Sequence, residues 1–204
     1  DRARRQPAAA GPRGWVPLPH LSFSPYLRLD RARSAGFLRA ARALLDAGAS
    51  ANTGFFERTH QPTPQWESAL YGAPGIAHHA ELTRLLLEHG ADPNDDEVPY
   101  HAPETTDNAA LKILVESGKL NDDSLATILL RKADWHDHDG IAWLLERGVK
   151  PNRITRFGRT ALHQAVLRDN VLDTIDLFLT YGADARLPGD VGPAIAIAAR
   201  RGRG

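Results

Sequence analysis

The segment DWHDHDG holds the densest group of side chains that could carry out chemistry. Its acids and histidines are Asp134, His136, Asp137, His138 and Asp139. Imidazole and carboxylate groups together can bind zinc or another divalent metal, so a metal-binding protein is one alternative function. Adjacent residues, however, project in different directions, and acids at the start of a helix interact favourably with the helix dipole. The interpretation we prefer is a turn between two helices, with no metal or other cofactor.

Other signs of catalysis are weaker. The pair His78-His79 fits a turn between helices, and the absence of cysteine excludes thiol catalysis, disulfides and zinc sites with cysteine ligands. No GxGxxG, P-loop, HExxH or GxSxG motif is present. We therefore expect no intrinsic catalysis. The chain could still be an accessory binding domain of a larger enzyme, and this alternative stays open.

Composition and charge are those of an ordinary soluble protein, with 42% hydrophobic and 25% charged residues. No stretch approaches the roughly 18 consecutive apolar residues of a membrane-spanning helix, and no signal peptide is evident. A cytoplasmic location is the resulting expectation. The 25 basic residues balance 25 acidic ones, which argues against general nucleic-acid binding, although the basic ends RARR and RRGRG could contact nucleic acid.

Charge is nevertheless unevenly distributed along the chain. Residues 1–42 hold nine arginines, residues 88–123 hold ten acids, and residues 147–204 hold ten bases. These bands are either solvated faces or a field that steers a charged partner.

A recurring phrase of apolar residues followed by glycine divides the chain into repeats. Its glycines are Gly48, Gly90, Gly118, Gly148 and Gly182, with gaps of 42, 28, 30 and 34 residues. Before each glycine the apolar residues fall three and four apart, the spacing of an amphipathic helix. Glycine can then adopt the left-handed conformation that ends a helix. The phrases predict helices that end near these glycines and pack on one another.

The segment GRTALHQAVLRDN (158–170) resembles the ankyrin repeat motif G-x-T-P-L-H-x-A-A-x-x-G-H. This resemblance implies an all-α solenoid of paired antiparallel helices with projecting loops, and a role in binding another protein. It also implies a hydrogen bond between Thr160 and His163 and hence a structural histidine. The other repeats are looser, and Pro74 and Pro103 should each shorten or kink a first helix.

The resemblance extends over residues 24–204, as about five repeats and a C-terminal half repeat. Residues 1–23, a basic stretch rich in alanine, proline and glycine, are expected to be a disordered leader. The sequence lacks methionine and stops inside a repeat, which suggests a fragment of a longer chain. We therefore expect Ile195 and Ile197 to have lost the helix that covers them and to expose apolar surface.

The long loop after the first repeat is the best candidate for partner recognition. Between Asn52 and Glu67 it is about nine residues longer than the period requires, and large aromatic side chains and arginine are typical of binding hot spots. The alternatives are that its aromatics pack back onto the repeats or that the loop is disordered. The candidate partner-binding residues are Phe55, Phe56, Arg58, His60, Trp66, Tyr71, Tyr100, Arg153, Arg156 and Phe157.

Overall fold

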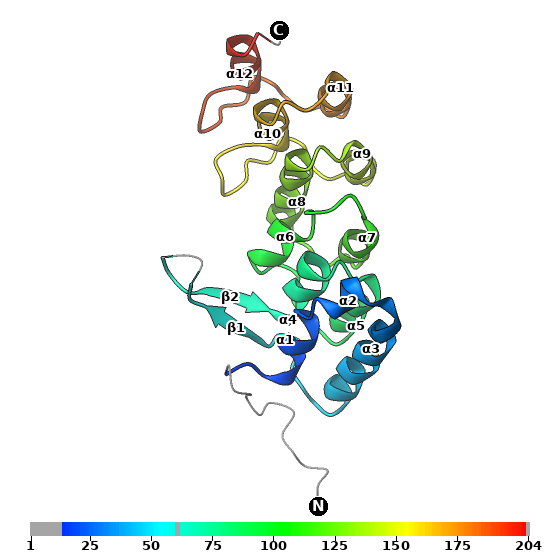
Figure 1. Cartoon of the computed structure of the whole chain (residues 1–204). Coiled ribbons are helices and arrows are strands. Elements are labelled where there is room, and N and C mark those ends of the chain that lie inside the picture. The colour runs from blue at the N-terminus through cyan, green and yellow to red at the C-terminus, as the bar shows by residue number, and fades with distance from the viewer. Residues whose placement is uncertain (1–13, 60–61, 203–204) are drawn as a thin grey trace, which may run out of the picture. The chain divides into compact units, whose positions relative to one another are not determined.

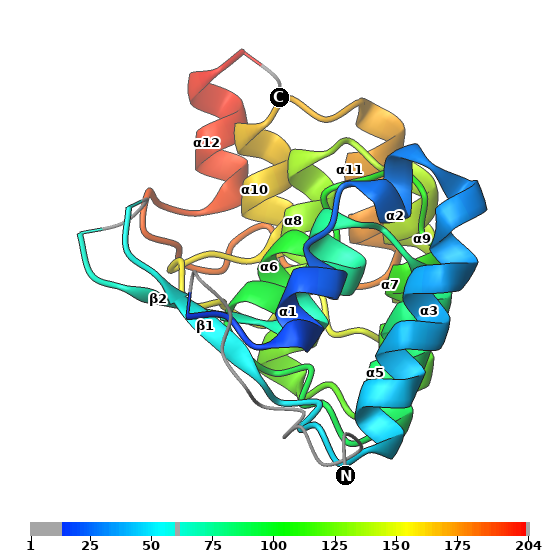
Figure 2. The ribbon, with the colours of Figure 1, turned by 60° about the horizontal axis from the view of Figure 1, so that its bottom comes forward.

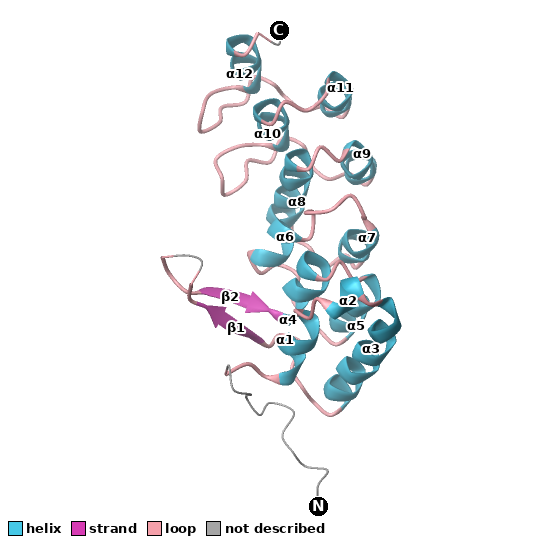
Figure 3. Ribbon diagram, viewed as in Figure 1, coloured by secondary structure: helices cyan, strands magenta, loops and turns pink. Residues whose placement is uncertain are grey.

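The structure is a computed structural model that describes residues 14–59 and 62–202. The chain divides into two compact units, one running to Ala102 with Asp107–Lys119 added, the other made of Pro103–Thr106 and the chain from Leu120 onward. Both units consist mainly of paired helices, as Figures 1 and 3 show. The prediction of an all-α helical repeat architecture is confirmed.

The first unit holds two rows of helices and a small hairpin. Its elements are α1 (Pro17–Ser22), α2 (Tyr26–Leu29), α3 (Arg31–Asp46), β1 (Gly54–Glu57), β2 (Gln65–Ser68), α4 (Ala69–Tyr71), the π-helical turn η1 (Gly72–Ile76), α5 (Ala80–Glu88), α6 (Glu97–His101) and α7 (Ala109–Glu116). Helices α1, α4 and α6 contact one another in sequence order and form one row, and α3, α5 and α7 form the other (Figures 1 and 2).

The second unit repeats this arrangement with more regular helices. Its elements are α8 (Asp122–Asp134), α9 (His138–Glu146), α10 (Ala161–Leu167), α11 (Leu172–Thr180) and α12 (Ala194–Arg200). Helices α8, α10 and α12 form one row, while α9 and α11 form the second (Figure 2). The core lies between the rows and includes Ile128, Leu144, Leu162 and Phe178.

The five recurring glycines all follow the end of a helix, as predicted. Each has a positive φ, between 67° and 91°, which a residue without a Cβ adopts at little cost. After α3, for example, Gly48 donates to the Leu45 carbonyl and Ala49 to the Leu44 carbonyl, which satisfies carbonyls that the helix end leaves open.

Both prolines that the sequence analysis singled out limit their helices. Pro74 lies in η1, where the short α4 passes into a wider turn. Helix α6 has only five residues and ends before Pro103. A proline ring has no N–H to donate and crowds the preceding turn, so neither helix could continue regularly.

Asparagines connect successive repeats in a way that the sequence analysis missed. The Asn152 side chain donates to the Gly182 carbonyl at 2.8 Å and accepts from the Asp184 amide at 2.7 Å. Asn52 makes the same pair of hydrogen bonds with Gly90 and Asp92. The sequence showed these asparagines only as turn formers, because their partners lie 30 or more residues further along the chain.

The hydrogen bond expected between Thr160 and His163 is present. The Thr160 hydroxyl lies 2.7 Å from His163 Nδ1, and the His163 Nε2 donates to the Leu187 carbonyl at 3.1 Å. Burial lowers the pKa of His163, which favours the neutral ring that this pattern needs. The pair His78-His79 lies at a helix junction, where His79 Nδ1 accepts from the Leu82 amide and caps α5.

Two expectations about the chain ends need correction. Residues 17–22 of the expected leader form helix α1, while residues 1–13 lie outside the described residues. At the other end, Ile195 is exposed as expected, but Ile197 is buried. Ile197 lies in α12, which packs against α10, so a single neighbouring helix is enough to cover it.

Among the residues that the structure describes, three other than glycine adopt a left-handed backbone, each at a turn inside a helix pair. They are His78, His136 and Asp169, with φ of 49°, 52° and 56°. Such a conformation costs roughly 1 kcal/mol for a residue with a Cβ. These positions therefore carry backbone strain.

We expect His136→Gly to stabilise the second unit by about 0.5–1 kcal/mol, because glycine relieves this strain and His136 lies exposed between α8 and α9. Thermal unfolding of the parent and the variant measures the effect. As a control, His136→Ala keeps a Cβ and should give no such gain. A lower melting temperature for His136→Gly would show that the side chain contributes to folding.

Candidate functional site

The long loop of the first unit forms an antiparallel hairpin, which Figure 3 shows in magenta. Its register pairs Phe55 with Glu67 and Phe56 with Trp66. Successive residues of a strand point to opposite faces, so the two pairs lie on opposite faces of the hairpin. The loop is therefore ordered over its described residues, and its aromatics are divided between two faces.

One face of the hairpin presents aromatic surface to solvent. The rings of Phe56 and Trp66 meet edge to face, with centroids 5.0 Å apart, yet the two residues are 58% and 39% exposed. Gly54 lies beneath the indole, and a Cβ there would approach Trp66 ring atoms to 2.8 Å. Arg58, also exposed, follows directly after β1. These three side chains, Phe56, Arg58 and Trp66, are called the hairpin patch below.

The opposite face of the hairpin is anchored through aromatic packing to the residues on either side of helix α1. Phe55 stacks on Trp15 with ring centroids 3.7 Å apart and meets the edge of Phe23 at 5.0 Å. Phe23 in turn packs edge to face with Tyr71 at 5.3 Å. This continuous cluster fixes the hairpin against the first unit, so the patch on its other face is held in place.

The structure separates the remaining candidates of the first unit. Tyr71 is buried in α4 and stacks on His101, so it belongs to the core and does not offer a contact surface. Tyr100 is half-buried on α6 and packs against the same histidine. His60 lies outside the described residues. The sequence could not reveal that Tyr71 faces inward, because its helix is too short to show a periodicity.

Arg153, Arg156 and Phe157 lie in the second unit, on the loop between α9 and α10. Arg153 Nε donates to Asp123 at 2.6 Å, and the Arg156 guanidinium lies over the Phe157 ring at 5.1 Å. Arg153 and Arg156 are exposed, while Phe157 is half-buried. These residues are placed in a different unit from the hairpin patch and form a separate candidate contact.

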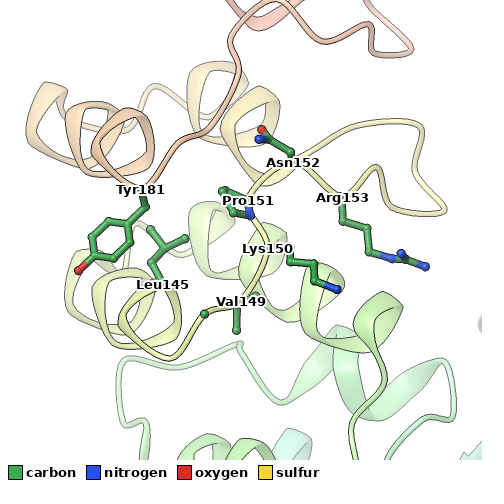
Figure 4. Close-up of a pocket in the computed structure, with 8 residues that line it drawn as sticks. Leu145, Val149, Lys150, Pro151, Asn152, Arg153 and Tyr181 are labelled. Atoms are coloured by element: carbon green, nitrogen blue, oxygen red, sulfur yellow. The ribbon is translucent and has the colours of Figure 1, made fainter.

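An open pocket of about 550 Å³ lies where the ends of α9 and α11 meet this loop (Figure 4). Leu145, Val149, Pro151 and Tyr181 supply its apolar lining. Its charged and amide side chains already have partners, because Lys150 pairs with Asp122, Arg153 with Asp123, and both ends of the Asn152 amide bind backbone. Few polar groups are thus left to orient a small-molecule ligand.

Carboxylates crowd the base of the hairpin in the first unit. Glu67 on β2 faces Glu97, Asp95, Glu57 and His101. Burial, reinforced by the Glu97 carboxylate, raises the pKa of Glu67 to about 7, and burial also raises the pKa of Asp95. The Glu67 Oε2 and Asp95 Oδ2 atoms are buried without a hydrogen-bond partner.

The raised pKa of Glu67 predicts a stability that depends on pH. Between the unfolded pKa of about 4.5 and the folded value of about 7, the folded state holds a proton that the unfolded state has lost, so stability falls as pH rises through this window. Glu67→Gln should match the melting temperature of the parent at pH 4 and melt about 2–4 °C higher at pH 8. This range corresponds to about 1 kcal/mol of stability, a value already reduced because Glu67 is partly solvated.

Thermal melts of the parent and the variant from pH 4 to pH 8 measure this difference. Because both proteins contain the same histidines, the contribution of the histidines cancels when the two melting temperatures are subtracted at each pH. Glu116→Gln, at an exposed site on α7, serves as the control and should give no difference that depends on pH. A Glu67→Gln melting curve parallel to that of the parent at every pH would contradict the prediction.

The segment DWHDHDG joins α8 to α9, and two of its three acids, Asp134 and Asp137, bind the protein's own groups. Asp134 pairs with Arg131 and Arg168 and accepts from Gln164. Asp137 accepts from the Gly140 amide, capping α9, and pairs with Lys132 at 2.7 Å. Across the described ranges 14–59 and 62–202, no group of three or more histidine, aspartate and glutamate side chains is arranged to hold a metal ion.

Lys132 is the buried partner that the sequence analysis did not identify. Its side chain is fully buried, and its ammonium group also donates to the Thr105 carbonyl at 2.6 Å. The sequence placed Lys132 in a helix beside Arg131, where a basic residue normally faces water. Only the adjoining turn shows that Asp137 folds back onto it.

The repeat pattern also matches a known family. The family model of ankyrin repeats (many copies) matches residues 129–179, which span α9, α10 and α11 together with the Thr160–His163 capping box. Residues 129–179 thus match ankyrin repeats, and the fold of the chain is that of ankyrin repeat domains. No curated protein sequence matches this chain.

Three solved structures of ankyrin repeat domains share the fold of this chain. The human ASB11 ankyrin repeat domain has a TM-score of 0.68 and 20% identity, with 96% of this chain and 82% of that chain covered. The ankyrin repeat domain of Bcl-3, a unique member of the IkappaB protein family, has a TM-score of 0.66 and 23% identity, with 88% of this chain and 81% of that chain covered. An ankyrin repeat domain from Acinetobacter baumannii AYE has a TM-score of 0.65 and 21% identity, with 88% of this chain and 93% of that chain covered.

Sequence reasoning missed the residues that hold the hairpin in place. Trp15 and Phe23 fell in the expected leader, yet they pack directly on Phe55. A tryptophan in a stretch rich in alanine, proline and glycine was the available signal, since such a large apolar ring seldom stays in solvent. Among the described helices, none is long and apolar enough to span a membrane.

Proposed function

We propose that this ankyrin repeat chain binds another protein through the hairpin patch, without catalysis of its own, and that it acts in the cytoplasm. Ankyrin repeat domains are general scaffolds for protein–protein interaction and typically have no catalytic role. The observation that carries the proposal is the exposed pair of Phe56 and Trp66 on a hairpin anchored from behind. Aromatic rings and arginine dominate binding hot spots, particularly where they are held rigidly.

The loop of the second unit is a second contact within the same function. Arg153 and Arg156 present two basic side chains, and the neighbouring Ile154 is 45% exposed. A charged rim around an apolar residue is a common composition of interfaces. Its arginines already have partners in the chain, so we assign this loop a smaller share of the binding energy than the hairpin patch.

Parallel captures from the source cells, with the parent chain and with Phe56→Ala/Trp66→Ala, test this function. We expect the parent to recover a protein that the double variant fails to recover. Purified components should then bind directly, and the double variant should keep the circular dichroism spectrum of the parent. Recovery of the same proteins in the same amounts by both chains would refute the assignment of the hairpin patch.

A further inference from the structure

The hairpin of the first unit has one edge that no strand covers. Strand β2 contacts α6, which lies on the side of the hairpin away from β1 in Figure 1. Strand β1 pairs with β2 alone among the described residues, because these two strands make up the whole sheet there. The outer edge of such a strand presents backbone N–H and C=O groups to which a further strand can pair.

The ladder of the hairpin shows which peptide groups face this edge. The Ala69 amide donates to the Thr53 carbonyl at 2.8 Å, so these two residues form a hydrogen-bonded pair. Hydrogen-bonded and non-hydrogen-bonded pairs alternate along an antiparallel ladder, and the register therefore turns the peptide groups of Phe55 toward β2. The peptide groups of Gly54 and Phe56 point away from β2. Within the described parts of the chain, no group hydrogen-bonds to the backbone of either residue.

An open groove of about 580 Å³ follows this edge. Every residue of β1 lines the groove, together with Trp15 and Trp66. The indole of Trp15 stacks on Phe55 and that of Trp66 meets Phe56, so the two tryptophans lie on opposite faces of the hairpin. The groove thus wraps around the edge of β1. An extended segment in it would find backbone partners along β1 and aromatic rings on both faces.

The charge at one end of the groove selects among extended segments. Arg58 also lines the groove and directly follows β1. Its side chain is exposed and pairs with no acid among the described residues. The alternation of a strand places Arg58 on the same face as Phe56. An acidic residue opposite Arg58 on an added strand would form a favourable cross-strand pair.

The residues before Gly14 do not suit this edge. Residues 1–13, which lie outside the described residues, contain two prolines, and proline has no N–H to donate to a neighbouring strand. They also contain four arginines and a single acid, so they would bring positive charge to Arg58. A segment without proline that carries an acid matches the edge better in both respects.

We propose that the hairpin patch holds its partner protein by strand addition, in which an extended segment of the partner pairs antiparallel with β1. The segment places apolar side chains opposite Gly54 and Phe56 and an acidic side chain opposite Arg58. Residues that oppose each other in a hydrogen-bonded antiparallel pair exchange both backbone bonds and lie on the same face. The apolar residues therefore bind the backbone of β1 and cover the Trp66 ring. This inference rests on the proposed function and adds the conformation and chemistry of the partner.

Synthetic peptides that bind the full chain test the direction of the backbone hydrogen bonds by fluorescence anisotropy. In the parent peptide isoleucine alternates with threonine, and aspartate replaces the first isoleucine so that it meets Arg58 in the antiparallel orientation. N-methylation of the isoleucines removes donors that face β1, and we expect it to weaken binding at least tenfold. N-methylation of the threonines is the matched control, since their amides face away from β1, and it should leave binding unchanged.

A second pair of peptides tests the charge. A peptide with lysine in place of the aspartate should bind at least tenfold more weakly than the parent peptide, and Arg58→Glu should reverse this preference. Arg84→Glu is the control for the chain, because Arg84 is exposed on α5, away from the groove. It should leave the preference for aspartate as it is.

Equal effects of the two N-methylations, or no binding of the parent peptide up to about 1 mM, would overturn strand addition. If Phe56→Ala/Trp66→Ala still abolished capture of the partner in that case, the hairpin patch would remain the contact and only the mode of binding would be wrong. Undiminished capture by the double variant would instead refute the proposed function itself. A dimer of the chain that the parent peptide dissociates in sedimentation would assign the edge to a second copy. Tighter binding of a peptide with the sequence of residues 1–13 would assign the edge to the chain's own start.

Discussion

Phe56→Ala is expected to weaken partner binding at least tenfold, about 1.4 kcal/mol, while the melting temperature stays nearly unchanged. Phe56 is 58% exposed, so little of its ring contributes to the folded core. Its loss removes the aromatic anchor of the hairpin patch. Trp66→Ala should have a similar effect on binding, with a small loss of stability because the indole covers Gly54. Isothermal titration with the captured partner and thermal unfolding measure the two quantities.

The adjacent residue provides the matched control for this prediction. Phe55 packs on Trp15 and Phe23 from the other face of the hairpin. Phe55→Ala should therefore lower stability by about 2–3 kcal/mol, less than a fully buried phenylalanine would. If Phe56→Ala instead caused the larger loss of stability and bound as well as the parent, the hairpin patch would be part of the fold and not a recognition surface.

Lys132→Met is expected to destabilise the second unit by about 3–5 kcal/mol, because it leaves the buried Asp137 carboxylate without its cation. At roughly 2–4 °C per kcal/mol for a chain of this size, the melting temperature should fall by about 6–20 °C. Asp137 also caps α9 through the Gly140 amide, so the loss should reach that helix. Thermal unfolding and the helical circular dichroism signal measure both effects.

Two further variants separate the buried charge from the loss of one lysine. Lys132→Met/Asp137→Asn removes both charges and keeps a capping side chain, so it should recover part of the lost stability. Lys150→Met breaks an exposed pair with Asp122 that water already screens, and we expect the melting temperature to stay nearly unchanged. Equal costs for Lys132→Met and Lys150→Met would contradict the assignment of Lys132–Asp137 as a buried ion pair.

The sequence by itself determined the repeat architecture of this protein. Gly48, Gly90, Gly118, Gly148 and Gly182 marked the helix ends, because only a residue without a Cβ adopts the left-handed backbone there at little cost. The hydrogen bond between Thr160 and His163 was implied by the resemblance to the ankyrin repeat motif, and it joins residues only three positions apart. Both signals are local. Chain neighbours alone create them, and they can therefore be read along the sequence.

Only the tertiary structure decided which aromatics of the long loop face outward. Phe55 and Phe56 are adjacent and chemically identical, and the hairpin register with Trp15 in the expected leader places one inside and one outside. The burial of Lys132, whose ammonium group also donates to the Thr105 carbonyl, likewise depends on a segment far away in the sequence. Burial and charge pairing arise from contacts between segments distant in the sequence, which residue type and spacing do not specify.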